Sequence, residues 1–420
     1  MLTRRDFMGG LAAGVLATCA AVKADTKVVE ASLESLRAWS AGGADWQALR
    51  RQFLLDPGVI HLNTGTLGAC PSVVVDAHIA FLRQIEANPA VLLFGSMGDA
   101  MEAVRQKAAA FLGADLNEVA LTPNTTTGMN IVATGLQWRP GDEVLTTTQE
   151  HAGGRVCWEY ARDRWGVVIR EVTIPTPAQS EAEVIAALKA GISERTKVIS
   201  ISHVNTITGL RMPVAKVAEL ARQSGAFLIV DGAQAPGMLN VDVHALGCDA
   251  YASSSHKWML APKGCGLLYL RREFQQHVKS GFLHSGLGAY TAATGTRNVP
   301  QILAHGVALD FHNLIGRQRI EERDLALARR LRERLLAVKN LEIVSSSVVS
   351  LQSGILTIKL KSATGDAAHD ELFKRKGFVV KAVPGEHLEG RAIRISTHLY
   401  NTERELELLA QELEQMATKN

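Results

Sequence analysis

Ile229–Gln234 (IVDGAQ) and Ser254–Trp258 (SSHKW) are the two stretches of sequence that decide the fold prediction. Short apolar runs at Ala226–Val230 and Ala250–Ser253 lead into them and predict two buried strands. Both stretches place polar side chains directly after a strand. Because ligands of open α/β sheets bind beyond the carboxyl ends of the strands, these turns predict a binding site at one edge of a parallel sheet.

Outward from these turns, the chain alternates between strand and helix patterns. Further strands are expected at Glu118–Thr122, Glu143–Thr147, Val167–Ile174, Lys197–Ser202 and Gly266–Leu270. Amphipathic patterns such as Met101–Leu112 and Val214–Gln223 predict helices beside them. The strands are apolar nearly throughout, which is typical of a sheet covered on both faces. We therefore predict an α/β fold with a largely parallel sheet.

A long charged helix at Arg317–Val338 leads out of this region into a second, α+β pattern. Strands are expected there at Leu341–Ser345, Gly354–Leu360, Phe378–Val383 and Ala392–Ser396, with helices at Asp366–Lys376 and Thr402–Met416. We predict four segments: a leader at 1–24, an N-terminal helical segment at 25–60, a large domain at 61–315 and a smaller C-terminal domain at 316–420.

Composition argues against several classes of protein. The 45 Lys and Arg residues are interleaved with 42 Asp and Glu residues, so there is no basic stripe of the kind that binds nucleic acid. The five cysteines show no CxxC spacing and the histidines are scattered, which disfavours a disulfide scaffold or a metal site. No GxGxxG motif follows a strand, which disfavours a nicotinamide oxidoreductase.

The N-terminus resembles a twin-arginine export signal. Arg4 and Arg5 precede a short Gly- and Ala-rich apolar run at 11–22, which is too short to stay in a bilayer as a permanent span. Cleavage is expected after Ala24, and lipid attachment at Cys19 is the alternative. We therefore expect the twin-arginine translocase to export the folded chain to the periplasm. Its usual cargo carries a cofactor.

The two deciding turns carry complementary chemistry. Asp231 can keep a pyridine nitrogen protonated, which makes the ring an electron sink, and Gln234 can donate to a phenolate oxygen on the same ring. Lys257 can form a Schiff base with an aldehyde, since burial lowers the pKa of a lysine. Alone, the aspartate would more often be a cap or a turn residue, and the lysine a solvated loop residue.

Two further strand ends complete the constellation. The segment Pro123–Asn130 joins a strand to a helix and carries Thr125 and Thr126, whose hydroxyls and amides suit a phosphate group. An ordinary helix cap is the alternative interpretation. His151 follows the strand Glu143–Thr147 and could stack on a planar ring. Each signal is weak alone, but the order and spacing of all four favour one cofactor site.

With these motifs the sequence resembles the class V aminotransferase family of fold-type I pyridoxal-phosphate enzymes. This family includes cysteine desulfurases and isopenicillin N epimerases, and the resemblance runs from His61 to the C-terminus. Besides the two deciding turns, His61–Gly68 (HLNTGTLG) is similar to the start of epimerase-like members. The resemblance implies the fold-type I architecture, with pyridoxal 5′-phosphate as the cofactor.

The resemblance also implies residue roles. Lys257 would form the Schiff base, Asp231 would pair with the pyridine nitrogen, and Gln234 would contact the phenolate oxygen. His151 would stack on the ring. The phosphate would be held by Thr126, Ser254 and His256, with Thr125 adjacent.

Two other segments match the family pattern. Gly295–Thr296 resembles the segment that reaches the phosphate from a partner subunit, which implies a homodimer with Thr296 at the cofactor. Arg394 matches the arginine that grips a substrate carboxylate, a task suited to a planar bidentate donor. An ion pair within the small domain is the alternative role for Arg394.

Two departures from the desulfurase pattern bear on the reaction. The stretch Lys381–Gly390 contains no cysteine where desulfurases carry a reactive one, which disfavours sulfur transfer. Thr206 stands where desulfurase-like members place an asparagine near the ring, so we expect it at the substrate with a different preference.

These observations predict an enzyme acting on the amino group or Cα of an amino acid or an amino-acid-bearing metabolite. Transamination, epimerisation and loss of a β-substituent share the same first steps and stay open. The chain also resembles exported family members that tailor secreted peptide metabolites such as siderophores. A periplasmic binding protein on an inherited fold is the non-enzymatic alternative.

Overall fold

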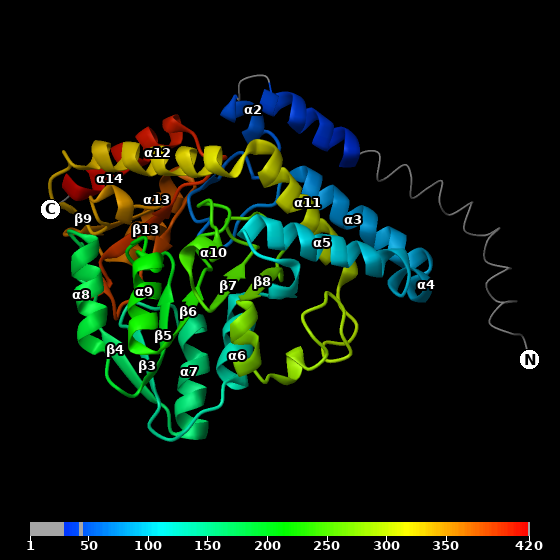
Figure 1. Ribbon diagram of the computed structural model, residues 1–420. Coiled ribbons are helices and arrows are strands. Elements are labelled where there is room, and N and C mark those ends of the chain that lie inside the picture. The colour runs from blue at the N-terminus through cyan, green and yellow to red at the C-terminus, as the bar shows by residue number, and fades with distance from the viewer. Residues whose placement is uncertain (1–28, 42–44, 419–420) are drawn as a thin grey trace, which may run out of the picture.

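The computed structural model describes residues 29–41 and 45–418, and its centre is a seven-stranded sheet (Figure 1). The spatial order is β2 (Val119–Thr122), β8 (Gly266–Leu270), β7 (Ala250–Ser254), β6 (Phe227–Asp231), β5 (Thr196–Ser202), β3 (Glu143–Thr147) and β4 (Val168–Val172). From β7 to β4 every pairing is parallel, whereas β8 runs antiparallel to both of its neighbours. Consequently β2 points the same way as β7, and its carboxyl end lies at the same edge of the sheet.

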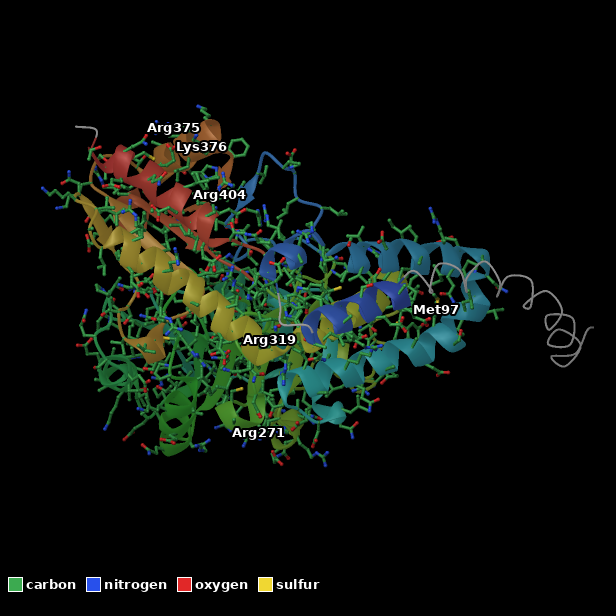
Figure 2. All side chains as sticks on the ribbon, turned by 90° about the horizontal axis from the view of Figure 1, so that it is seen from above. Met97, Arg271, Arg319, Arg375, Lys376 and Arg404 are labelled. Atoms are coloured by element: carbon green, nitrogen blue, oxygen red, sulfur yellow. The ribbon has the colours of Figure 1, made fainter. Side chains whose placement is uncertain are left out.

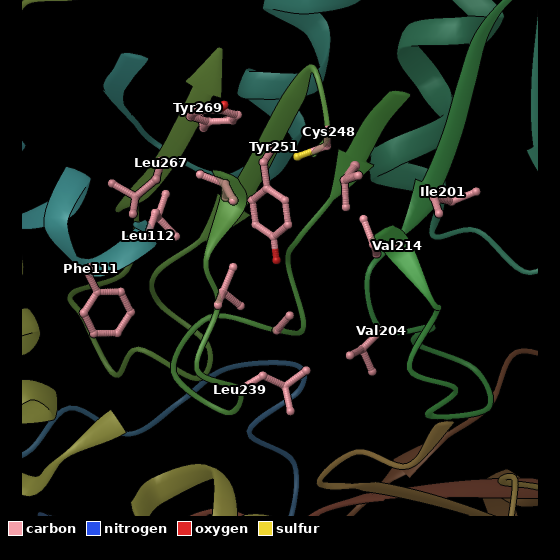
Figure 3. Packing of buried hydrophobic residues seen from close by; sticks show 14 of the residues in the cluster. Phe111, Leu112, Ile201, Val204, Val214, Leu239, Cys248, Tyr251, Leu267 and Tyr269 are labelled. Carbon is pink, nitrogen blue, oxygen red and sulfur yellow. The ribbon is translucent and has the colours of Figure 1, made fainter. Parts of the chain in front are cut away.

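Helices cover both faces of this sheet, as the apolar strands predicted. One face packs under α6 (Thr125–Gly135) and α7 (Ala152–Trp165), and the other under α5 (Ser96–Leu112), α8 (Glu181–Gly191), α9 (Val214–Ser224) and α10 (Val243–Leu246). Successive strand residues alternate between the two cores: Val198 lies on the first and Ile199 on the second. Figure 3 shows the second core around Tyr251, which is fully buried.

A third layer closes the end of the sheet next to β2. It contains α2 (Trp46–Arg50), α3 (Ser72–Ala87), α4 (Pro89–Leu93) and α11 (Val299–Ile315). Residues 29–41 form a further helix, and Figure 2 places Arg319 beside it, where its guanidinium donates to Ser40 Oγ at 3.1 Å. The twin-arginine signal, its cleavage site and Cys19 lie outside the described residues. Within the described ranges, no helix combines the length and apolarity needed to span a membrane.

The C-terminal unit is built on α12 (Arg317–Leu335), the long helix at the top of Figure 1. Its four-stranded antiparallel sheet has the order β12 (Lys381–Ala382), β13 (Ala392–Ser396), β10 (Ile355–Leu360) and β9 (Leu341–Ile343). Helices α13 (Gly365–Lys376) and α14 (Glu403–Thr418) pack with these strands around one apolar cluster. The short 3₁₀ turns are Leu116–Glu118, Arg272–His277, Gly281–Leu283, Val349–Leu351 and Leu388–Gly390.

The prediction of one continuous strand at Phe378–Val383 is wrong, because the structure divides this segment between two sheets. Its first half, β11 (Phe378–Val379), pairs in parallel with β1 (Ile60–His61), and its second half is β12. Leu62 is fully buried in the C-terminal apolar cluster. The chain near residue 61, where we expected the large domain to begin, therefore contributes to the C-terminal unit. The predicted α/β fold class itself is confirmed.

Candidate active site

The carboxyl ends of β3, β5 and β7 lie at one edge of the large sheet, and the residues after them line a cavity of about 790 Å³. Asp231 is the last residue of β6, and Lys257 follows β7 on one side of it. His151 follows β3 on the other side and caps α7 by accepting from the Gly153 amide at 3.0 Å. Lys257, His151, Thr206 and Arg394 all line the cavity, so the structure brings these predicted site residues together.

Burial tunes the lysine and the aspartate in opposite directions. Burial lowers the pKa of Lys257 to about 8, although the nearby Asp231 carboxylate acts to raise it. Burial raises the pKa of Asp231, whose Oδ1 accepts from the Ala233 amide at 2.9 Å. Among the described residues no hydrogen bond to Lys257 Nζ is found. A lysine with a lowered pKa and an unengaged amine is suited to act as a nucleophile and a base.

The start of α6 and the loop after β7 form a polar cradle. Thr125 donates its amide to Ser254 Oγ at 3.0 Å, and the two hydroxyls lie 2.8 Å apart. The buried Ser255 Oγ and His256 Nδ1 have no hydrogen-bond partner within the described chain. Burial lowers the pKa of His256 to about 4, so the ring is neutral. Buried polar atoms without partners beside a helix N-terminus fit a bound phosphate group.

Thr126 lies on the side of this cradle that faces α7. A Cβ added to Gly153 would come within 2.7 Å of Thr126 Oγ1, and one added to Gly154 within 2.6 Å of Asp231 Oδ2. Both positions therefore need glycine so that α7 can approach the site closely. The same approach brings His151 to the cavity, where burial lowers the pKa of its ring.

Gln234 connects the loop after β6 to Thr206, which lines the cavity. Its Oε1 accepts from the Trp258 indole at 2.7 Å, and its Nε2 donates to Gly65 O at 2.8 Å and Thr206 Oγ1 at 3.2 Å. These bonds fix the amide with Nε2 toward Thr206. The predicted contact of Gln234 with a ring oxygen stays a prediction.

Arg394 reaches the cavity from β13 and is only 5% exposed. Its Nη1 donates to Thr206 Oγ1 at 2.6 Å, and its Nη2 donates to Asn63 Oδ1 at 3.0 Å and Thr66 Oγ1 at 2.9 Å. Burial lowers the pKa of Arg394 to about 10. No carboxylate contacts it within the described chain, so the structure shows no small-domain ion pair for it. A buried cation held only by neutral groups is arranged to receive an anion.

Sequence reasoning missed three residues of the site. Asn63 and Thr66 lie in the quoted stretch His61–Gly68. No feature of the sequence around them predicts that they bind Arg394, which is far away in the chain. Glu150 precedes His151 and lines the cavity, where it accepts from Thr147 Oγ1 at 2.7 Å and from the Ser202 hydroxyl. Burial raises the pKa of Glu150 to about 7. Its position after β3 could have suggested it.

Thr296 lies elsewhere in this single chain. It is exposed on the loop before α11 and does not line the cavity. Its expected place at the phosphate depends on a second subunit and stays a prediction.

Comparison with known proteins identifies the family. The family model described as aminotransferase class-V matches residues 62–409. The chain belongs to the class V aminotransferase family. Among curated class V members, the isopenicillin N epimerase of Amycolatopsis lactamdurans is 33% identical over 395 residues, which covers 89% of this chain and 98% of the relative. A probable cysteine desulfurase of Methanothermobacter thermautotrophicus is 28% identical and covers 88% of this chain and 97% of the relative.

Solved structures of other proteins share this fold. The apo cysteine desulfurase of Thermococcus onnurineus NA1 superposes with a TM-score of 0.78 at 23% identity, over 89% of this chain and 98% of that one. The cystine C–S lyase C-DES superposes with a TM-score of 0.76 at 24% identity, over 84% and 97%. C-DES has been solved with glycine linked to its pyridoxal-phosphate cofactor. The cofactor of this class V chain is pyridoxal 5′-phosphate.

Proposed function

We propose that this class V enzyme breaks a bond at Cα of an amino acid or of an amino-acid residue carried by a larger metabolite. The observation that carries the proposal is the convergence of Lys257 and Arg394 on one cavity, with Asp231 close enough to Lys257 for its charge to act on the lysine pKa. Lysine and aspartate provide the groups that attach and polarise the cofactor, and the arginine provides a site for the carboxylate of an amino acid.

Each residue of the site has a proposed role in binding the cofactor, binding the substrate or moving the proton. The pyridine ring of the cofactor, when bound, withdraws electrons from Cα, and Asp231 would keep its nitrogen protonated. Thr126, Ser254 and His256 would hold the phosphate, with Thr125 beside them, and His151 would stack on the ring. Arg394 would hold the substrate carboxylate and thereby orient Cα. Lys257, released by the incoming amine, would remove the Cα proton as a base whose pKa lies near neutral pH.

Epimerisation is the outcome that the site favours. An epimerase removes the Cα proton on one face and returns it on the other. Lys257 follows β7 and Glu150 follows β3, so the two protonable groups flank the Asp231 strand from opposite sides. The pKa of about 7 for Glu150 lets it donate or accept near neutral pH. The 33% identity to an isopenicillin N epimerase supports the same outcome.

Transamination would follow if the proton returned to the cofactor carbon, and a lyase reaction if a β-substituent left. Sulfur transfer from cysteine is the outcome that we disfavour. The loop Lys381–Gly390 reaches the cavity without a cysteine, and none of the four described cysteines, Cys70, Cys157, Cys248 and Cys265, lines it. Within the described residues, therefore, no thiol is placed at the cavity to accept sulfur.

Spectroscopy and hydrogen exchange test this proposal together. We expect a yellow protein whose absorbance bleaches with borohydride and leaves the pyridoxyl group on Lys257, as peptide mapping would show. Incubation with both enantiomers of a set of amino acids in D₂O should place deuterium at Cα and yield the opposite enantiomer. Release of ammonia without exchanged substrate would indicate a lyase instead. A protein that gains no absorbance with pyridoxal phosphate would refute the enzyme proposal.

We also propose that the chain works in the periplasm as a homodimer. Support comes from the paired Arg4 and Arg5 at the N-terminus and from the resemblance of Gly295–Thr296 to a partner-contact segment. Replacing both arginines by lysine should retain the protein in the cytoplasm if the twin-arginine translocase is its partner. Equilibrium sedimentation of the holoenzyme should give twice the chain mass.

A further inference from the structure

Lys381 and Arg394 lie directly opposite each other on neighbouring antiparallel strands. The register of β12 and β13 pairs Lys381 with Arg394 and Ala382 with Ile393. Directly opposed residues project from the same face of a sheet, with Cβ atoms roughly 5 Å apart. Arg394 points into the cavity, and Lys381 lines the same cavity. Two cationic side chains are therefore aimed at one space.

No carboxylate in the described chain neutralises the positive charges of Lys381 and Arg394. In residues 29–41 and 45–418, no carboxylate lies within 4.0 Å of either cation. The carboxylates that line the cavity are engaged elsewhere: Glu150 with hydroxyls, Glu159 with Arg155 at 3.5 Å, and Glu386 beside His387 at 4.0 Å. Like charges placed directly opposite on a sheet are unfavourable unless something offsets them. An anionic ligand would offset them here.

The two cations lie at different depths. Arg394 is 5% exposed and is tied inward by Thr206, Asn63 and Thr66. Lys381 is exposed and sits on the edge strand of the small sheet, where its charge still reaches His151. The guanidinium therefore lies at the floor of the cavity and the ammonium near its mouth. A substrate carboxylate bound to Arg394 at the floor leaves Lys381 free to bind a second carboxylate of the same substrate.

We propose that the enzyme selects amino-acid substrates that carry a second carboxylate, with Lys381 as the residue that recognises it. This substrate class rests on the proposed function, in which Arg394 binds the carboxylate next to Cα. A cavity of about 790 Å³ leaves room for that second carboxylate on a side chain or further along a peptide-like substituent. Lys381 is a specificity residue and takes no part in the Cα chemistry.

The test compares dicarboxylic amino acids with their neutral counterparts on the holoenzyme. Glutamate and aspartate would be titrated against glutamine and asparagine, in both enantiomers, by following the visible absorbance of the bound cofactor. Half-saturation should occur at lower concentrations of the dicarboxylic members. Lys381→Met should raise the half-saturating concentration of glutamate about tenfold, as expected for one charge-assisted contact, and change that of glutamine less than about twofold. Lys381→Arg should restore most of the loss.

Lys359→Met is the matched control. Lys359 lies on β10 of the same small sheet, but it pairs with Glu389 at 2.7 Å and does not line the cavity. Its replacement should leave both titrations unchanged. If Lys381→Met weakened the binding of glutamate and of glutamine equally, the proposal would be overturned. Lys381 and Arg394 would then both bind the carboxylate next to Cα. Equal wild-type affinity for acidic and neutral amino acids would also overturn it.

Failure of the broader function has a different signature. If the enzyme does not act on amino acids, no amino acid of any kind changes the absorbance of the bound cofactor. If only the substrate class is wrong, glutamate and glutamine both change that absorbance, at the same half-saturating concentration in the wild type.

Discussion

Burial controls the protonation of Lys257 and Asp231, the two residues that we propose hold the cofactor. Lys257 must be neutral to attack the aldehyde, and its pKa of about 8 places that change near physiological pH. The neighbouring Asp231 carboxylate favours the charged amine and so raises this pKa, whereas Arg394 lowers it. The charge on Asp231 therefore slows cofactor attachment at neutral pH, even though the same charge is needed once the ring is bound.

The pH dependence of cofactor loading tests this balance. The rate at which the cofactor-free protein gains visible absorbance should rise with pH, with its midpoint near pH 8. In Asp231→Asn the midpoint should move to lower pH, because the anion that raises the lysine pKa is gone. Glu150→Gln should leave the midpoint in place. A midpoint near the ordinary lysine value in the wild type would contradict the burial argument.

At the scale of single elements, α7 shows how closely a helix must approach the site. Gly154 lies in its first turn, where a Cβ would come within 2.6 Å of Asp231 Oδ2. Glycine is otherwise unfavourable inside a helix, by about 1 kcal/mol relative to alanine. At this position the close approach outweighs the helix propensity.

Gly154→Ala should therefore impair function more than stability. The added methyl displaces the carboxylate of Asp231, and a misplacement of this kind lowers the rate of Cα hydrogen exchange by about 100-fold. The midpoint of thermal unfolding should stay within a few degrees of the wild type, because alanine favours the helix. Gly281→Ala, whose Cβ would meet nothing within 4 Å, is the control. Full exchange activity in Gly154→Ala would show that Asp231 tolerates the methyl.

Across the whole molecule, a buried pair ties the C-terminal unit to the lysine loop. His398, after β13, bonds Asp324 of α12 at 2.7 Å and the Trp258 carbonyl at 3.0 Å, and both side chains are fully buried. The carbonyl only accepts, so His398 Nε2 carries a proton. Burial lowers the pKa of His398 to about 3 and raises that of Asp324, and both shifts favour the neutral pair in which the Asp324 carboxyl donates to Nδ1.

Urea unfolding of the holoenzyme checks this arrangement. His398→Leu should reduce the free energy of unfolding by about 3 kcal/mol, since it leaves two buried polar groups without a partner. Asp324→Asn should cost less than about 1 kcal/mol because the amide can still donate to Nδ1. Lys107→Ala, which breaks the partly exposed pair with Asp310 at 2.5 Å, should cost no more than about 1 kcal/mol. Equal losses for Asp324→Asn and His398→Leu would show that the pair is ionised.

The sequence by itself determined the α/β class, most strand positions and the turns that carry Asp231, Lys257 and His151. These features depend on local apolar patterns and on the general rule that ligands bind at the carboxyl ends of strands. Only the tertiary structure decided that Phe378–Val383 divides between two sheets, that Asn63 and Thr66 hold Arg394, and that Lys381 stands opposite that arginine. Each of these depends on pairing between segments far apart in the chain. Local periodicity carries no record of such pairing, because burial and register are set by the partner strand.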